Sequence, residues 1–289
     1  MPNSRERKIK KILRLKKMYA ITSKRKKPKS EGKYVTIKTP AGDVRSLWYG
    51  FGNTEIKPLF IGLHGGGFVM GDPLMDERMN LSFMREADCK VISVDYPKAP
   101  ENPYPAAIEQ IDALVTHLVE GADIYKIDPS RIAIGGHSAG GNLSAVMCLK
   151  AKTHDKYSFV CQVLDYPPLD LATSPYDKPN PKGAIPPKIA EMFDTCYFEP
   201  GQGRDKYISP VYAEPEDIKG LPPAMFVLAG RDSLHDEGMR YYEMLKDAGV
   251  ECDLHDYPDS AHGFTLKDTA DARDAIEKMG KFLKKHLQG

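Results

Sequence analysis

The chain has 289 residues, of which 41% are hydrophobic and 28% charged, and its formal net charge is +1. This size suffices for one large α/β domain. No apolar run reaches the ~18–20 residues that a transmembrane helix requires. The N-terminus has no apolar core of the kind found in signal peptides, so we expect none. The five cysteines are widely spaced and form no C-x-x-C pair, which favours reduced, mostly buried thiols in a cytoplasmic protein over a disulfide framework or a zinc site.

Positive charge is concentrated at the N-terminus. Residues 1–29 hold thirteen lysines and arginines and one acid, which leaves a net charge of −11 on the rest. Apolar residues recur at helical spacing from Ile9 to Tyr19 and predict an amphipathic helix. Three interpretations are open: a helix docked on the acidic body, a membrane-surface helix or a nucleic-acid-binding tail. Because the helix is short and lacks Trp and Phe, we favour docking and expect neither stable membrane association nor nucleic-acid binding.

Strand and helix patterns alternate along the rest of the chain. KYVTIKTP and DVRSLWYG flank Ala41-Gly42 and predict a β-hairpin. Further strands are predicted at 59–64, 91–96, 131–136, 159–166, 224–230 and 252–257. Helices are predicted near 76–88, 105–119, 189–197, 236–248 and 269–287, and around Leu143. This alternation is typical of βαβ units, so we predict an α/β fold with a mostly parallel central sheet and helices on both faces.

One stretch interrupts the alternation. Residues 167–223 are rich in proline and contain one helical pattern, from Ile189 to Tyr197. Long irregular segments in compact domains are usually lids or binding loops. We therefore predict a helical cap that combines the basic N-terminal segment, residues 1–30, with an insertion at about 167–215.

The segment RIAIGGHSAGGNLSAVM, residues 131–147, joins a predicted strand to a predicted helix. Its centre, residues 136–140, matches the G-x-S-x-G pattern of a nucleophile elbow, a sharp turn that exposes Ser138. A serine hydroxyl is a poor nucleophile at neutral pH and needs a base, an acid that orients the base, and donors for the developing oxyanion. Because the flanking strand and helix are the context that this motif requires, we predict that Ser138 is the nucleophile.

A glycine-rich loop, LHGGGFVMG at residues 63–71, follows the preceding predicted strand. Its three glycines carry no side chains and can present backbone N–H groups to an oxyanion. A phosphate-binding loop would end in Gly-Lys-Ser/Thr, whereas Phe68-Val69 follow here. We expect His64 to be a structural residue of this loop rather than a base.

Two candidates for the acid and the base follow predicted strands. Asp232 comes after strand 224–230, and His262 comes after strand 252–257. The carboxyl ends of parallel strands meet at the sheet edge that holds ligand sites in open α/β folds. Asp232 would orient His262, which would deprotonate Ser138 and later protonate the leaving group.

Alternatives exist for both partners. Asp236 and Glu237 lie near Asp232, but at a predicted helix start, where acids complement the helix dipole. His255 lies inside a predicted strand, and His137 occupies the variable position of the elbow, whereas the base must approach on a separate loop. The other histidines lie on predicted helices or loops without a partner pattern: His117, His154, His235 and His286.

Several long motifs resemble one family. HGGG at 64–67, VDYPKAPENPYPA at 94–106, GHSAGG at 136–141, GLPPAMFVLAGRDSLHDEG at 220–238 and HGF at 262–264 resemble the hormone-sensitive-lipase-type carboxylesterases, also called bacterial family IV esterases. The resemblance covers about residues 58–285. The chain departs from the family at the elbow, where His137 stands in place of a frequent Asp, at Ser233, where Pro often follows the triad acid, and at Pro97-Lys98, where Arg-Leu is usual.

The resemblance implies an α/β-hydrolase fold with a catalytic domain over 31–289 and an N-terminal cap. It implies hydrolysis of short- to medium-chain carboxylic esters without a metal or other cofactor. The implied catalytic triad is Ser138, Asp232 and His262. The implied oxyanion donors are the N–H groups of Ala139 and two loop glycines, Gly66 and Gly67 being favoured and Gly65 the third candidate.

Other functions remain open at this point. An amidase, formamidase or peptidase could use the same fold, and an interfacial lipase would account for the basic N-terminus. Plant gibberellin receptors resemble this family but lack the triad histidine, whereas His262 is present here. We expect a small-molecule ester as the substrate, and an edge strand or helix could support a homodimer.

Overall fold

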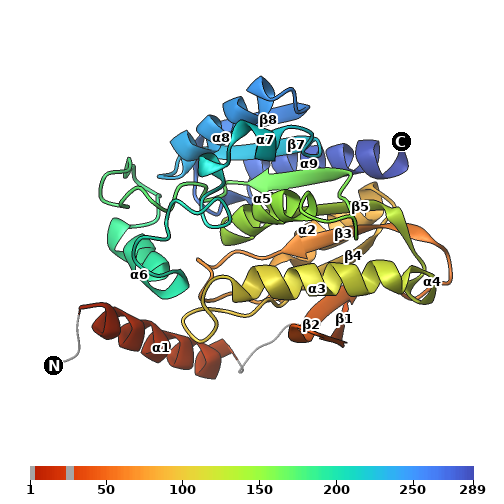
Figure 1. The fold of residues 1–289 in the computed structure, drawn as a ribbon, viewed down its shortest axis with the longest axis horizontal. Coiled ribbons are helices and arrows are strands. Elements are labelled where there is room, and N and C mark those ends of the chain that lie inside the picture. Colours follow the sequence, from red (N-terminus) through yellow and green to blue (C-terminus); the bar gives the residue numbers. More distant parts are fainter. Residues whose placement is uncertain (1–3, 24–28) are drawn as a thin grey trace.

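The computed structural model describes residues 4–23 and 29–289. Within these residues one eight-stranded sheet runs through the molecule in the order β1-β2-β4-β3-β5-β6-β7-β8 (Figure 1). The pairs β1–β2 and β2–β4 are antiparallel, and the pairs from β4 to β8 are parallel. The strands are β1 (Lys33–Thr39), β2 (Gly42–Tyr49), β3 (Lys57–Leu63), β4 (Lys90–Val94), β5 (Ile127–His137), β6 (Cys161–Asp165), β7 (Ala224–Arg231) and β8 (Cys252–Ala261).

Helices cover both faces of this sheet, as the alternation predicted. Buried side chains of α3, α5 and α8 pack on one face, and those of α2 and α9 pack on the other. The helices are α1 (Ser4–Ser23), α2 (Glu77–Glu86), α3 (Ala106–Glu120), α4 (Ala122–Tyr125), α5 (Ala139–Ala151), α6 (Pro187–Tyr197), α7 (Pro215–Ile218), α8 (His235–Asp247) and α9 (Ala270–Gln288). Short 3₁₀ turns lie at Pro73–Asp76, Pro210–Tyr212 and Phe264–Leu266.

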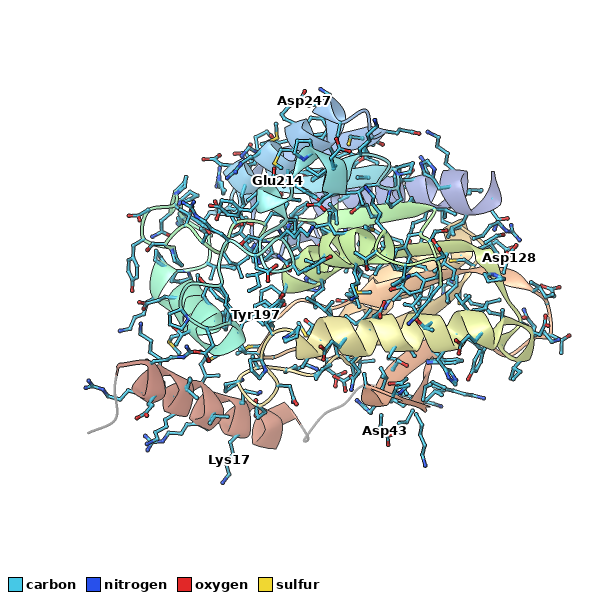
Figure 2. The ribbon with its side chains drawn as sticks, viewed as in Figure 1. Lys17, Asp43, Asp128, Tyr197, Glu214 and Asp247 are labelled. Carbon is cyan, nitrogen blue, oxygen red and sulfur yellow. The ribbon has the colours of Figure 1, made fainter. Side chains whose placement is uncertain are left out.

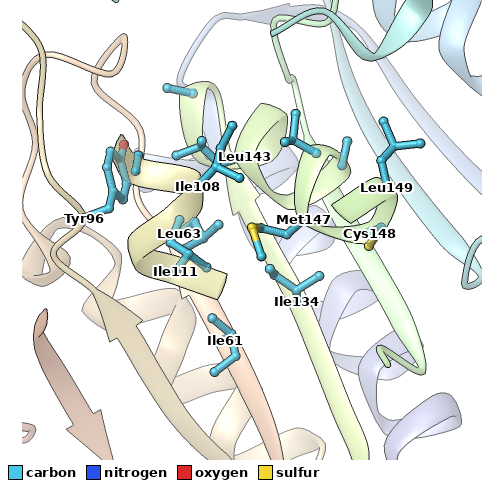
Figure 3. Close-up of a cluster of buried hydrophobic side chains, with 14 of the residues drawn as sticks. Ile61, Leu63, Tyr96, Ile108, Ile111, Ile134, Leu143, Met147, Cys148 and Leu149 are labelled. Atoms are coloured by element: carbon cyan, nitrogen blue, oxygen red, sulfur yellow. The ribbon is translucent and has the colours of Figure 1, made fainter. Parts of the chain in front are cut away.

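The central core lies between β3, β5, α3 and α5. Figure 3 shows Ile61 and Ile134 of the two strands beside Ile111 of α3 and Met147 of α5. All four side chains are fully buried. Helix α5 is buried on nearly every side, which explains why its sequence is apolar all round rather than striped.

Two strands are longer than their apolar runs predicted. β5 begins at Ile127, four residues before the predicted start, and β8 continues to Ala261, four residues past the predicted end. In β8 the continuation includes Pro258, and the β7–β8 register shifts between Ala229 and Arg231, where Gly230 lies against Pro258. A proline cannot donate to a strand ladder, so its presence concealed this extension.

Helix α1 docks on the body through α6 and the loop near residue 99. Ile12 is 1% exposed, Lys8 forms an ion pair with Glu191 at 2.6 Å, and Lys16 Nζ donates to the Ala99 carbonyl at 2.9 Å. Lys17 lies on the outer side of the helix (Figure 2). The basic residues at 24–27 lie outside the described residues.

The cysteines are all unpaired, four of them buried and Cys252 partly so. Across the described part of the chain, no helix combines the length and the apolar character that a membrane crossing requires.

Because Ile12 anchors α1, we expect Ile12→Glu to release the helix. Burial of an isoleucine side chain contributes about 1.5–3 kcal/mol, so the variant should be cut by trypsin within residues 1–30 at least about tenfold faster than the wild type, measured by mass spectrometry of early fragments. Leu13→Glu is the matched control, since Leu13 is 37% exposed on the same helix. Equal cleavage of both variants would contradict this anchoring.

Candidate active site

A strained turn between β5 and α5 holds Ser138. Its φ is +52° and its ψ is −125°, a conformation that residues other than glycine rarely adopt. The Ser138 N–H donates to the Asp165 carbonyl at 2.8 Å. A Cβ at Gly136 or Gly140 would overlap the Leu63 carbonyl. These two glycines are therefore required for β3 to pass close beneath the turn.

The structure brings Ser138, His262 and Asp232 into one hydrogen-bonded chain. His262 Nε2 lies 3.0 Å from Ser138 Oγ, and His262 Nδ1 lies 2.6 Å from Asp232 Oδ2. Asp232 follows β7 and His262 follows β8, so adjacent parallel strands deliver both side chains to the same edge of the sheet. Ser138 is 7% exposed and Asp232 2%. Such an arrangement can move a proton from the serine hydroxyl to an imidazole held by a buried carboxylate.

The alternative acids and bases lie elsewhere. Asp236 is exposed, and Glu237 forms a buried ion pair with Lys178 at 2.6 Å. His255 lies within β8, 3.3 Å from Asp253. None of these side chains is hydrogen-bonded to Ser138 or His262.

The glycine loop after β3 lies beside the serine. The Gly66 carbonyl accepts hydrogen bonds from the N–H groups of Val69 and Met70 at 3.2 and 3.0 Å. Gly66 has a φ of +125°, and a Cβ there would overlap the Met70 carbonyl. Among the described residues, no group accepts a hydrogen bond from the Gly66 or Gly67 N–H.

The other candidate oxyanion donors are the N–H groups of Ala139 and Gly65, which differ in their hydrogen bonding. Ala139 is the first residue of α5, where the N–H has no partner within the helix and the helix dipole favours negative charge. The Gly65 N–H donates to His137 Nε2 at 3.0 Å. With the His137 ring neutral, Gly65 is engaged beneath the loop, which favours Gly66, Gly67 and Ala139 as the candidate donors.

His64 is a buried residue of this loop. Its Nδ1 lies 2.7 Å from the Gly65 carbonyl, and its own carbonyl accepts a hydrogen bond from the Tyr96 hydroxyl at 2.7 Å. Burial lowers the pKa of His64 to about 4, so the imidazole is neutral at physiological pH. Its contacts are all within the loop and its neighbours, which fits a structural residue.

The sequence did not reveal a buried polar cluster under the elbow. His137 Nε2 also lies 2.8 Å from Asp76 Oδ1; when the ring is protonated, this nitrogen donates to Asp76 and no longer accepts from Gly65. Burial opposes a charged imidazole, but the nearby Asp76 and Asp165 carboxylates raise the pKa of His137. Burial also raises the pKa of Asp165 to about 7. The three side chains line a cavity of about 20 Å³, large enough for one water molecule.

A second, larger pocket opens directly at Ser138. Its walls come from the loop after β3, the segment 168–185, α6 and the turn after β7, and they leave a free volume of about 40 Å³. Most of the lining is apolar: Gly67, Phe68, Pro168, Leu171, Pro175, Ile185, Ala190, Phe193 and Leu234. Phe193 covers Gly67 so closely that a Cβ on that glycine would overlap the ring. Within the described residues, no group of three or more His, Cys, Asp or Glu side chains could hold a metal ion.

A family model described as the alpha/beta hydrolase fold matches residues 60–266. The chain belongs to the α/β-hydrolase family. The resemblance to the hormone-sensitive-lipase-type branch is confirmed. The carboxylic ester hydrolase LipN of Mycobacterium tuberculosis is 35% identical over 80% of this chain and 63% of its own length. The carboxylesterase NlhH of the same organism is 35% identical over 72% of this chain and 66% of its own length.

Solved structures agree with this placement of the fold. A thermostable esterase from Pseudomonas putida superposes with a TM-score of 0.84 and 30% identity, over 90% of this chain and 84% of that one. A carboxyl esterase from the fungus Tuber melanosporum gives a TM-score of 0.83 and 28% identity, over 91% and 89%. The matched region spans just under two thirds of the length of the first curated relatives.

The His137–Asp76 pair yields a double-mutant test. His137→Leu and Asp76→Leu should each lower the free energy of unfolding by about 3–5 kcal/mol, because each leaves the other group buried and unpaired. The double variant should lose clearly less than the sum, as measured by urea denaturation.

The matched control is the partly exposed pair of His235 and Asp256, whose atoms lie 3.2 Å apart. Its coupling energy should stay within about 1 kcal/mol. Additive losses for His137 and Asp76 would show that their contact does not stabilise the elbow.

Proposed function

We propose that this protein is a serine carboxylesterase that cleaves short- to medium-chain carboxylic esters through an acyl-enzyme. The observation that carries the proposal is the continuous chain of hydrogen-bonding distances from Ser138 through His262 to Asp232, 3.0 and 2.6 Å. The relatives include a carboxylic ester hydrolase and a carboxylesterase, which supports the same chemistry.

In the first half-reaction, Ser138 Oγ attacks the ester carbonyl while His262 Nε2 takes its proton. Asp232 holds the Nδ1–H tautomer and stabilises the imidazolium that forms. The oxyanion receives hydrogen bonds from Gly66, Gly67 and Ala139, whose N–H groups are fixed before the reaction and cost no reorganisation. The alcohol then departs with the proton from His262.

In the second half-reaction, water replaces the alcohol. His262 takes a proton from the water, which attacks the acyl carbonyl, and then returns that proton to Ser138. The free enzyme and a carboxylic acid result. No step requires a metal ion or an organic cofactor.

The cap that covers the site sets the size of the substrate in this proposal. α6 and the 167–215 insertion form walls of the pocket at Ser138, and α1 packs on the outside of α6. The mostly apolar lining fits an acyl or alkyl group. Residues 1–30 and 167–215 together therefore act as the substrate-selecting part of the chain.

Ser138→Ala should lower kcat/KM for p-nitrophenyl butyrate by at least about 10⁴-fold, because no other group can form the acyl-enzyme. Ser130→Ala is the matched control: Ser130 bonds Asp128 early in the same strand, β5, and its loss should leave turnover unchanged. Wild-type turnover by Ser138→Ala would overturn the proposal.

Fluorophosphonate labelling separates the enzyme from a receptor on the same fold. The wild type should carry one phosphonyl group on Ser138 by peptide mass spectrometry, because the hydroxyl is paired with His262 at 3.0 Å. Unlabelled protein that bound a small molecule tightly would favour the receptor instead.

A matched ester and amide address the amidase alternative. We expect p-nitrophenyl butyrate to be cleaved at least about 10³-fold faster than p-nitrobutyranilide in kcat/KM, since p-nitrophenolate leaves without a proton whereas the anilide nitrogen must first receive one from His262. Comparable rates would assign the site to amides.

A further inference from the structure

The pocket at Ser138 is not purely apolar. Two charged side chains, Lys178 and Asp194, line it together with the nucleophile. Asp194 also lines an outer groove between α1 and α6, which shares Pro175 with the inner pocket. Asp194 therefore lies at the boundary between the outer groove and the space beside the serine.

The charge of Lys178 is already satisfied. Its Nζ donates to Glu237 Oε2 and to the Asp170 carbonyl, both at 2.6 Å. The other Glu237 oxygen accepts the Leu169 N–H at 2.7 Å. The lysine and the glutamate thus neutralise each other and fix the loop that forms the pocket wall.

Asp194 differs from these two residues. No described residue donates a hydrogen bond to its carboxylate, and the side chain, which lies on α6, is partly exposed at the pocket. Burial raises the pKa of Asp194 to about 7, and Lys178 moderates the rise. Water can hydrate a partly exposed carboxylate in the free protein, so a substrate that displaces this water loses affinity unless it supplies a donor in its place.

We propose that Asp194 is a specificity-determining residue that accepts a hydrogen bond from a hydroxyl or ammonium group carried by the ester substrate. The inference rests on the proposed function, because the same pocket holds Ser138. With Lys178 and Glu237 paired, the charge left to the pocket is that of Asp194, so a donor or a cation complements it whereas an anionic substituent is repelled.

Isosteric ester pairs test this preference on both sides of the scissile bond. On the acyl side, ethyl 3-hydroxybutanoate is compared with ethyl 3-methylbutanoate. On the alcohol side, 2-hydroxyethyl butanoate is compared with propyl butanoate, and 2-(dimethylamino)ethyl butanoate with 3-methylbutyl butanoate. In each pair a donor replaces a hydrocarbon group of the same shape, and acid release is followed by pH-stat titration.

For at least one pair, the wild type should prefer the donor-bearing ester by about tenfold or more in kcat/KM, the range expected for a hydrogen bond to a charged group. Asp194→Leu should abolish this preference while retaining cleavage of the hydrocarbon ester. Asp194→Asn should keep a hydroxyl preference but lose an ammonium preference. Asp177→Leu is the matched control, since Asp177 is exposed next to Lys178 and lines neither pocket.

The pH dependence separates an ammonium from a hydroxyl. Asp194 ionises as the pH rises through about 7, so a preference for the ammonium ester should increase from pH 6 to pH 8. The charged groups that face Asp194 are Lys178, Glu237 and Glu191, and burial also raises the pKa of Glu237 to about 7. The readout is therefore the wild-type ratio divided by the Asp194→Leu ratio at each pH, which removes the titration of the Ser138–His262 site that both proteins share.

The outcomes distinguish the two proposals. Wild-type cleavage of the hydrocarbon esters without any donor preference, or a preference that survives in Asp194→Leu, would overturn the role of Asp194 and leave the esterase intact. Failure of the wild type to cleave any of the esters would overturn both.

Discussion

The close approach of β3 to the elbow is the constraint on which the site depends. Leu63, the last residue of β3, pairs in register with Gly136 of β5, and its carbonyl occupies the space that a Cβ at Gly136 or Gly140 would fill. This packing fixes the positive φ of Ser138 and also sets where the glycine loop begins. Ser138 and the glycine loop are thus positioned by one strand contact, so neither can shift without the other.

A layer of polar groups beneath the elbow reinforces this contact. His137 lies between Asp76 and the Gly65 N–H, so one imidazole joins the end of β5 to the first glycine of the loop. Asp165, the last residue of β6, is held by Thr265 Oγ1 at 2.7 Å. At position 137 this chain has a histidine where its family often has an aspartate. This histidine is buried and supports the elbow and the glycine loop from beneath.

The sequence predicted the sheet, the helices on both faces and the segments that converge on Ser138, because each of these depends on local patterns: apolar runs, helical spacing and glycine motifs. It did not predict the length of β8, because Pro258 reads as a strand terminator while a register shift accommodates it. Nor did it connect Asp76 with His137, since their 61-residue separation carries no local signal and the contact exists only after β3 and β5 pair. The sequence also carried no sign that Asp194 lies at the pocket without a partner among the described residues, because this too depends on how distant segments pack.

Helix α6 contacts both the glycine loop and the N-terminal helix α1. On its inner side Phe193 covers Gly67, and the Tyr197 ring stacks on Phe68 with centroids 3.8 Å apart. On its outer side Glu191 pairs with Lys8 of α1. Because the same eleven-residue helix contacts the glycine loop, carries Asp194 and supports α1, the docking of the basic N-terminal helix is mechanically linked to the shape of the pocket. Of the positive charge on α1, Lys8 pairs with α6 itself, whereas Arg5 and Lys16 pair with Glu199 and Glu101, so the helix is tied both to α6 and to the neighbouring loops.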